Sequence, residues 1–202
     1  FNFFSWFGIH LCEQSIYGSF RIELNFHKEI KFDLTKLENR ILDNAVLPSL
    51  DDPCGRFLNY RDFIECGETQ QRTGILNLPK RPESYGAINA LATMVLDLVI
   101  EEYGMIKLTY GFSSPELSRV IMARIAPKID QHSACELSRQ SMPICSRQGA
   151  AVDFIVEDES MLEVAQWIAK HCEFDRLYYY GDDRPVHVSA GPENNGAIVL
   201  MK

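Results

Sequence analysis

Apolar and polar positions alternate in several stretches of the chain, which is the pattern of half-buried β-strands. Residues 20–27 alternate in this way, and Ile30, Phe32 and Leu34 continue the period after a short turn. This pattern predicts a β-hairpin. From residue 35 the apolar spacing changes to that of an amphipathic helix, which we expect to end before Pro48.

The middle of the chain is punctuated by turn-forming residues. They dominate residues 51–55 and 67–82, so we expect mostly loop there, with residues 60–69 as a polar connector. A longer helix follows, with Ser84 as its N-cap and Gly104 at its C-terminal end. Residues 106–110 then predict a strand. A helix over residues 116–126 is opened by Pro115, whose missing N–H is not needed in a first turn.

The C-terminal part alternates strands with one helix. After a polar loop over residues 127–148, we expect strands at 151–156, 176–180 and 186–189 and an edge strand at 197–201. The helix over 160–172 should turn its apolar side chains inward, namely Met161, Val164, Ala165 and Ile168. This order predicts an α+β fold with helices on one face of an antiparallel sheet. We divide the chain into an N-terminal extension, residues 1–82, and a domain, residues 83–202.

Composition narrows the classes of function. With 202 residues, of which 46% are hydrophobic, the chain can bury a substantial core. The net charge of −8 does not support a broad nucleic-acid surface, although it leaves a local basic pocket open. The apolar opening, residues 1–7, is too short to span a membrane.

The six cysteines form no CxxC pair, so we expect reduced thiols in a cytoplasmic protein. The chain begins with Phe rather than Met, and we expect either that upstream residues were removed or that it is a piece of a longer polypeptide.

One carboxylate interrupts an apolar strand. Asp153 lies between Val152 and Phe154, where a charge is costly unless it is paired or bound to a metal. If the valine and phenylalanine face the helices, Asp153 faces the other side of the sheet, together with the small Ala151. The same alternation separates His187 from its neighbouring valines. These two residues on neighbouring strands can share a cation, or the Asp can pair with an Arg while the His is an ordinary sheet residue.

Three blocks of sequence carry a resemblance to a known family. The segment YGFSSPELSR (110–119) resembles the S-G-Y-R-S-x-x-L-N-R segment of the zinc D-Ala-D-Ala peptidases, which share the fold of the Hedgehog signalling domain. The segment GAAVD (149–153) is similar to the G-x-A-x-D half of their zinc motif, S-x-H-x-x-G-x-A-x-D. FDRL (174–177) followed by PVHVS (185–189) is similar to the closing F-D-Q-L and W-V-H-V-S block.

The resemblance implies a zinc ion held by His, Asp and His, with water as fourth ligand and an acidic residue as general base. Asp153 and His187 fall on two of these ligand positions. Ser146 stands where the family has its first His. Two residues of the preceding loop are candidates for the third ligand: His132, in a segment that resembles the S-x-H step, and Cys145. The alternative is that both are ordinary loop side chains.

The expected substrate and base positions also differ from the family pattern. Ser113 stands where the family has an Arg that binds the substrate carboxylate, and Arg147 or Arg184 are candidate replacements. The general-base Glu falls near Tyr179 or Tyr180, and the nearest acids are Asp182 and Asp183. Tyrosines 178–180, together with Phe112 and Arg184, can line a pocket for a flat ligand or simply pack on the sheet.

Two functions follow from this pattern. One is zinc-dependent hydrolysis of a peptide or amide bond, with a peptide or other small ligand in the cleft. The other is an inactive, peptidase-like binding module. A third hypothesis makes the domain the C-terminal part of a larger nucleic-acid-modifying or phage-encoded protein.

Overall fold

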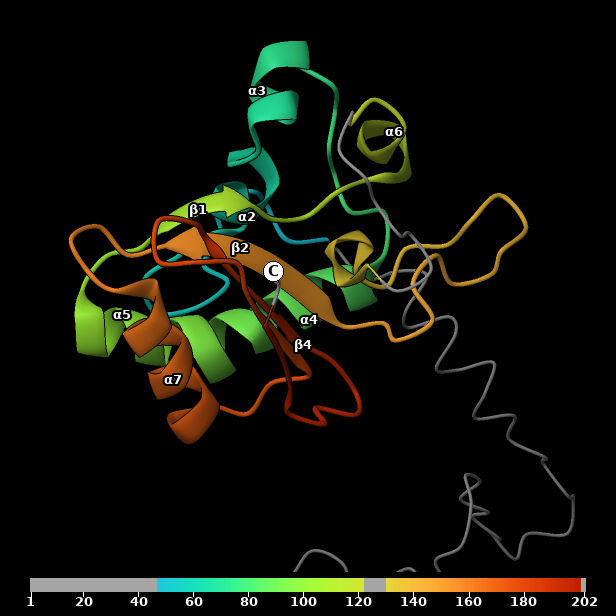
Figure 1. Ribbon diagram of the computed structural model, residues 1–202. Helices are drawn as coiled ribbons and strands as arrows, with labels where there is room; N and C mark the ends of the chain where they lie inside the picture. The colour runs from blue at the N-terminus through green and yellow to red at the C-terminus, as the bar shows by residue number, and fades with distance from the viewer. Residues whose placement is uncertain (1–46, 122–129, 201–202) are drawn as a thin grey trace, which may run out of the picture. The chain divides into compact units, whose positions relative to one another are not determined.

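The computed structural model describes residues 47–121 and 130–200 (Figure 1). The hairpin and helix predicted between residues 20 and 46 lie outside the described residues, as does the end of the helix predicted at 116–126. The described residues belong to one compact unit. The boundary expected at residue 82 falls inside this unit, because Tyr60 and Phe63 share a buried core with Ile88 and Leu91.

A five-stranded sheet forms the centre of the described fold. Its strands are β1 (Lys107–Tyr110), β2 (Ala150–Ile155), β3 (Arg176–Tyr179), β4 (Val186–Ala190) and β5 (Ala197–Leu200), in the order β1-β2-β4-β3-β5. The sheet is mixed, whereas the sequence predicts an antiparallel sheet. β3 lies between β4 and β5 and is antiparallel to β4. The chain reverses its direction between β4 and β5, so β5 runs parallel to β3.

Helices cover the apolar face of this sheet. α4 (Pro82–Leu91), the π-helical turn η1 (Ala92–Leu96) and α5 (Asp97–Tyr103) form one continuous helical segment. α4 packs against β2 and β4, and α7 (Met161–His171) packs against β3 (Figure 1). As predicted, Met161, Val164, Ala165 and Ile168 are all buried. The result is a mixed α/β architecture with its core between the sheet and these helices.

The helical segment over residues 82–103 begins earlier than expected. Its N-cap is Arg81 and Pro82 occupies the first turn, whereas Ser84, the expected cap, is buried and donates its hydroxyl to Glu136 Oε1 at 2.8 Å. The segment is long and apolar enough to cross a membrane by length and composition alone. More than half of it is buried within the fold, which is the behaviour of a core helix.

Two short helices replace the connector expected before it. α2 (Tyr60–Glu65) begins at Asn59, whose side chain accepts from Asp62 N, while the Asp62 carboxylate accepts from Asn59 N. This reciprocal cap satisfies N–H groups that a helix start leaves unpaired. α3 (Glu68–Thr73) follows after Gly67. The polar residues of this stretch therefore cap and cover helices rather than form an irregular connector.

The remaining short elements precede β2 in the chain. α6 (Pro115–Ser118) begins at Ser114, with Pro115 in its first turn as predicted. The 3₁₀ helix η2 (Gln131–Ser133) lies in the long loop before β2 and contacts that strand. The five cysteines of the described part of the chain are free thiols.

Candidate metal centre

Two neighbouring strands hold Asp153 and His187 directly opposite each other in the β2–β4 register. His187 Nδ1 lies 2.8 Å from Asp153 Oδ1. Val152 and Val188, their strand neighbours, are fully buried against the helices, so both polar side chains project from the opposite face. The alternation seen in the sequence is therefore confirmed at these two positions.

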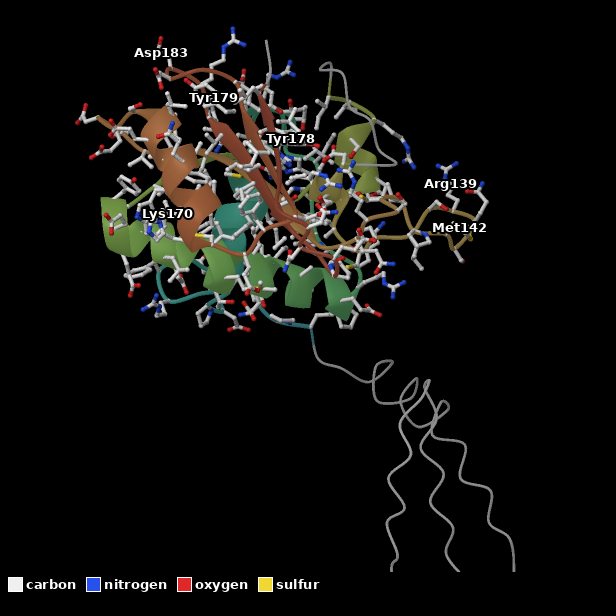
Figure 2. The ribbon with its side chains drawn as sticks, turned by 60° about the horizontal axis from the view of Figure 1, so that its bottom comes forward. Arg139, Met142, Lys170, Tyr178, Tyr179 and Asp183 are labelled. Carbon is white, nitrogen blue, oxygen red and sulfur yellow. The ribbon has the colours of Figure 1, made fainter. Side chains whose placement is uncertain are left out.

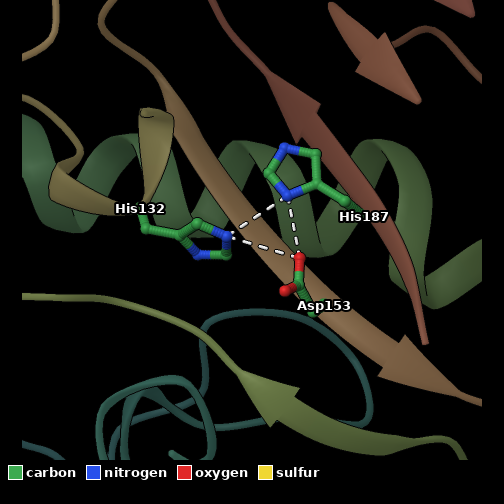
Figure 3. A group of neighbouring side chains, drawn as sticks. All are labelled: His132, Asp153 and His187. Atoms are coloured by element: carbon green, nitrogen blue, oxygen red, sulfur yellow. Dashed lines mark hydrogen bonds and ion pairs between the residues drawn. The ribbon is translucent and has the colours of Figure 1, made fainter. Parts of the chain in front are cut away.

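His132 reaches the same point from η2 (Figure 3). Its Nε2 atom lies 3.3 Å from Asp153 Oδ1 and 3.2 Å from His187 Nδ1. Both imidazoles are buried, with the two histidines 4% and 8% exposed, while Asp153 is partly open. The three potential ligand atoms lie within 4.8 Å of one another, so the group can hold a metal ion.

The spacing of these atoms matches a small coordination sphere. Bonds of about 2.0–2.1 Å to a tetrahedral ion place ligand atoms about 3.3 Å apart. The observed separations of 2.8, 3.2 and 3.3 Å come close to that value. Only a small movement of Asp153 and His187 would make the three edges equal.

A backbone contact orients the His132 ring. Its Nδ1 lies 2.8 Å from the carbonyl oxygen of Gly111, which can only accept, so Nδ1 carries the proton and donates it there. The lone pair of Nε2 is then left to face Asp153 and His187, as in a metal-binding histidine with a supporting acceptor. The Tyr110 ring packs on His132 with 4.2 Å between centroids.

Gly111 can supply this carbonyl only because it lacks a side chain. A Cβ at this position would stand 2.2 Å from the carbonyl oxygen of Phe63. The same Phe63 oxygen accepts the Phe112 N–H at 2.9 Å, which fixes the segment against α2. The close approach of α2 to the end of β1 therefore sets the direction of the His132 ring.

Further contacts hold the backbone of η2 in place. The carbonyl of His132 accepts the Ser113 N–H at 2.9 Å. The buried Gln131 side chain accepts from Ser189 Oγ and donates to the carbonyl of Gln148, both at 2.8 Å. Ser189 lies on β4, two residues beyond His187. The loop that carries His132 is thus tied to the strand that carries the second histidine.

The charges of the group stabilise one another. Burial alone would raise the pKa of Asp153, but the two histidines outweigh it and hold that pKa well below its usual range. Burial alone would lower the pKa of His132, yet the Asp153 carboxylate outweighs it and the pKa of His132 is raised. A proton and a metal ion therefore compete for the Nε2 atom of His132.

Cys145, the other candidate for the third ligand, does not lie in the three-residue group. It is buried in the loop before β2. Ser146, which follows it in the chain, is exposed. Of the two third ligands considered from the sequence, the structure brings His132 to the strand pair.

Neither candidate general base joins the group. Asp182 Oδ1 accepts from Ser160 Oγ, Leu162 N and Tyr179 OH at 3.0 to 3.1 Å, so this carboxylate caps the start of α7. Asp183 is exposed in the same turn and projects outward beyond Tyr179 (Figure 2). The reason is strand alternation, since Tyr179 packs toward the helix-covered core and brings the following turn to α7.

The expected substrate-binding residues are spread over several sites. Ser113 is buried and its Oγ lies 2.9 Å from Ser118 Oγ, so it supports the loop around His132. Arg184 is exposed in the turn after β3, and Arg147 is half-buried in the loop before β2. Tyr180 is half-buried and is close enough to the centre to be influenced by the charge of Asp153. Burial, together with the charge of Asp153, raises the pKa of its phenol to about 12.

Sequence reasoning missed the residues that position His132. Gly111 belongs to the segment that resembles the family, but its carbonyl contact has no signature in the sequence. Gln131 has no signature in the sequence either, because polar residues are ordinary in a loop and only its partners show its role. Tyr110 lies directly opposite Asp153 across β1 and β2, a position that only the register shows.

Comparisons with protein-family models, with curated proteins and with solved structures found no match to this chain. The class that fold and site define is therefore a mixed α/β domain with a candidate metal centre on the open face of its sheet.

Proposed function

We propose that this domain is a zinc-dependent hydrolase that acts on a peptide or amide bond. The observation that supports the proposal is the convergence of His132 Nε2, Asp153 Oδ1 and His187 Nδ1 on one point. Two imidazoles and one carboxylate are a typical catalytic zinc set, which leaves a position for water or substrate. The family resemblance of the surrounding segments supports the same choice of metal.

The chain's own residues have defined roles in this proposal. Zinc in such a site supplies a Lewis acid that acidifies water and polarises a carbonyl group. Asp153 supplies negative charge, and Gly111 and the loop contacts keep the His132 lone pair directed at the ion. The phenol of Tyr180 is protonated at neutral pH, as for an ordinary tyrosine, and can donate a hydrogen bond to a substrate oxygen.

The alternative is a binding module that holds a metal or ligand without turnover. The observation that favours it is the position of Asp182, whose carboxylate caps α7 instead of serving as a base. Asp153 is the one carboxylate in the three-residue group that the described residues form. Turnover therefore separates the two functions, whereas metal binding alone does not.

The test begins with metal content. Protein purified with zinc present should retain one zinc per chain, and Asp153→Ala should lower its affinity by more than about 100-fold because a charged ligand is removed. Asp182→Ala is the matched control, since it removes a carboxylate outside the group. Equal zinc binding by Asp153→Ala and the parent protein would contradict the ligand assignment.

Hydrolysis is then measured on a panel of quenched fluorescent peptides and amides with the zinc-loaded protein. Turnover that is lost on chelation, restored by zinc and absent from Asp153→Ala supports the hydrolase. Zinc binding without turnover on any substrate favours the binding module.

A further inference from the structure

A row of side chains crosses the sheet at the level of the metal centre. The register places Tyr110 opposite Asp153, Asp153 opposite His187, His187 opposite Tyr178, and Tyr178 opposite Val199. Directly paired residues project from the same face of a sheet. The two strand-borne ligands are therefore flanked by a tyrosine on each side.

The two ends of this row differ in exposure. On the β1 side, Tyr110 packs on His132 and its phenol oxygen is buried. On the β3 side, Tyr178 stacks on His187 with 4.8 Å between centroids and 18° between planes. It is half-buried, and Val199 beyond it is 37% exposed. We call these two residues the Tyr178–Val199 shelf, which extends from the metal centre to the edge of the sheet.

The charged residue nearest along β3 is engaged by other groups. Arg176 lies two residues before Tyr178 and so on the same face. Its guanidinium donates to the carbonyl of Asp175 at 3.0 Å and to the side chain of Asn195. The shelf itself therefore offers a ring face and aliphatic surface, which favour apolar or aromatic groups.

We propose that the substrate carries an apolar, ring-bearing group that rests on the Tyr178–Val199 shelf while its reacting carbonyl faces the metal centre. The inference rests on the proposed function, because the metal defines where that carbonyl lies. The stack of Tyr178 on His187 places the inner end of the shelf beside a metal ligand, so this group is adjacent to the scissile bond.

Three hydroxamates test the shelf in the zinc-loaded protein, because each anchors on zinc through the same atoms. Benzohydroxamate carries a ring, acetohydroxamate carries a methyl group, and succinic monohydroxamate carries a carboxylate. We expect benzohydroxamate to bind about tenfold more tightly than acetohydroxamate, as measured by calorimetry. The carboxylate-bearing probe should bind no better than acetohydroxamate.

Matched variants on β5 locate the effect. Val199→Ser should lower the preference for benzohydroxamate about threefold, because apolar surface is lost from the shelf. Ile198→Ser removes a more exposed aliphatic residue from the other face of β5 and should leave the preference unchanged. Circular dichroism confirms that both variants keep the fold.

The outcomes separate the two proposals. Equal affinity for all three probes, strongest binding of the carboxylate probe, or equal effects of the two serine variants would overturn the shelf and leave the metal centre standing. If no hydroxamate binds to a protein that fails to retain zinc, the proposed function is overturned and the shelf with it.

Discussion

The three candidate ligands come from two kinds of structure. Asp153 and His187 lie on paired strands, where a repeating ladder of hydrogen bonds sets their positions. His132 lies in a long loop, where its position depends on single contacts to Gly111, Ser113 and the anchors of Gln131. The strand pair is thus fixed by the fold itself, whereas the third ligand can be moved without unfolding the sheet.

This difference separates stability from metal affinity. Changes in the strand ladder should affect both, because the sheet is the centre of the core. Changes in the loop contacts should mainly affect the metal, because they alter how well His132 is presented.

The largest effect is expected for Gly149→Ala, which disrupts the pairing of β2 with β4. Gly149 has φ of 85°, and a Cβ there would stand 2.0 Å from the carbonyl oxygen of Ala190 on β4. We expect destabilisation of more than about 3 kcal/mol, or failure to fold, in urea denaturation. Gly86→Ala is the control, since its Cβ meets open space in α4 and should stabilise by about 0.5–1 kcal/mol. Similar stabilities of the two variants would contradict this account.

The second largest effect is a loss of zinc affinity when the loop ligand His132 is removed. His132→Ala should lower zinc affinity by about 100-fold or more while the far-ultraviolet spectrum is retained, because a ligand is lost but the strands remain paired. Cys145→Ser should bind zinc like the parent protein, since this thiol lies outside the group. The reverse result in a zinc titration would make the cysteine the loop ligand.

A smaller effect is expected when the anchor of the loop is removed. Gln131→Ala should weaken zinc binding about tenfold, because η2 loses its contacts to Ser189 and to the carbonyl of Gln148. Ser189→Ala removes one of these contacts from the other end. A double-mutant cycle on zinc affinity should show coupling between the two substitutions. Strict additivity would show that this contact does not position His132.

The smallest effect is the response to pH near neutrality. Because Asp153 raises the pKa of His132 despite burial, zinc affinity should begin to fall on acidification above the ordinary histidine value of about 6.5. The sign follows from competition, since each proton taken up on Nε2 occupies the position of the metal. Zinc titrations between pH 5.5 and 8 measure it, and an affinity independent of pH over that range would contradict the assignment of His132.

The sequence was most informative where side chains repeat regularly. Alternation along β2 and β4 was sufficient to place Asp153 and His187 on the open face, since a strand has only two faces. The strands of the C-terminal part, α7 and the position of Pro115 at the start of α6 follow from similarly local patterns. The parallel pairing of β5 could not be read in the same way, because it depends on which strand lies beside it in space.

The rest of the site depends on contacts between distant segments. The sequence leaves both His132 and Cys145 open as third ligand, and the choice is made by the Gly111 carbonyl and by Ser189, which lie in other elements. The roles expected of Asp182 and Asp183 rested on closeness along the chain to His187. Instead, Tyr179 packs on the helix-covered face of the sheet, so the turn that contains Asp182 lies against α7.

The side chain of Gln131 also closes the loop that follows it. By donating to the carbonyl of Gln148, it joins the two ends of a segment whose middle, including the exposed Met142, extends away from the sheet. Lengthening a closed loop costs little, since loop entropy grows only slowly with length. Residues 138–142 therefore offer an insertion site, where a peptide tag or a recognition element could be added without moving the metal ligands.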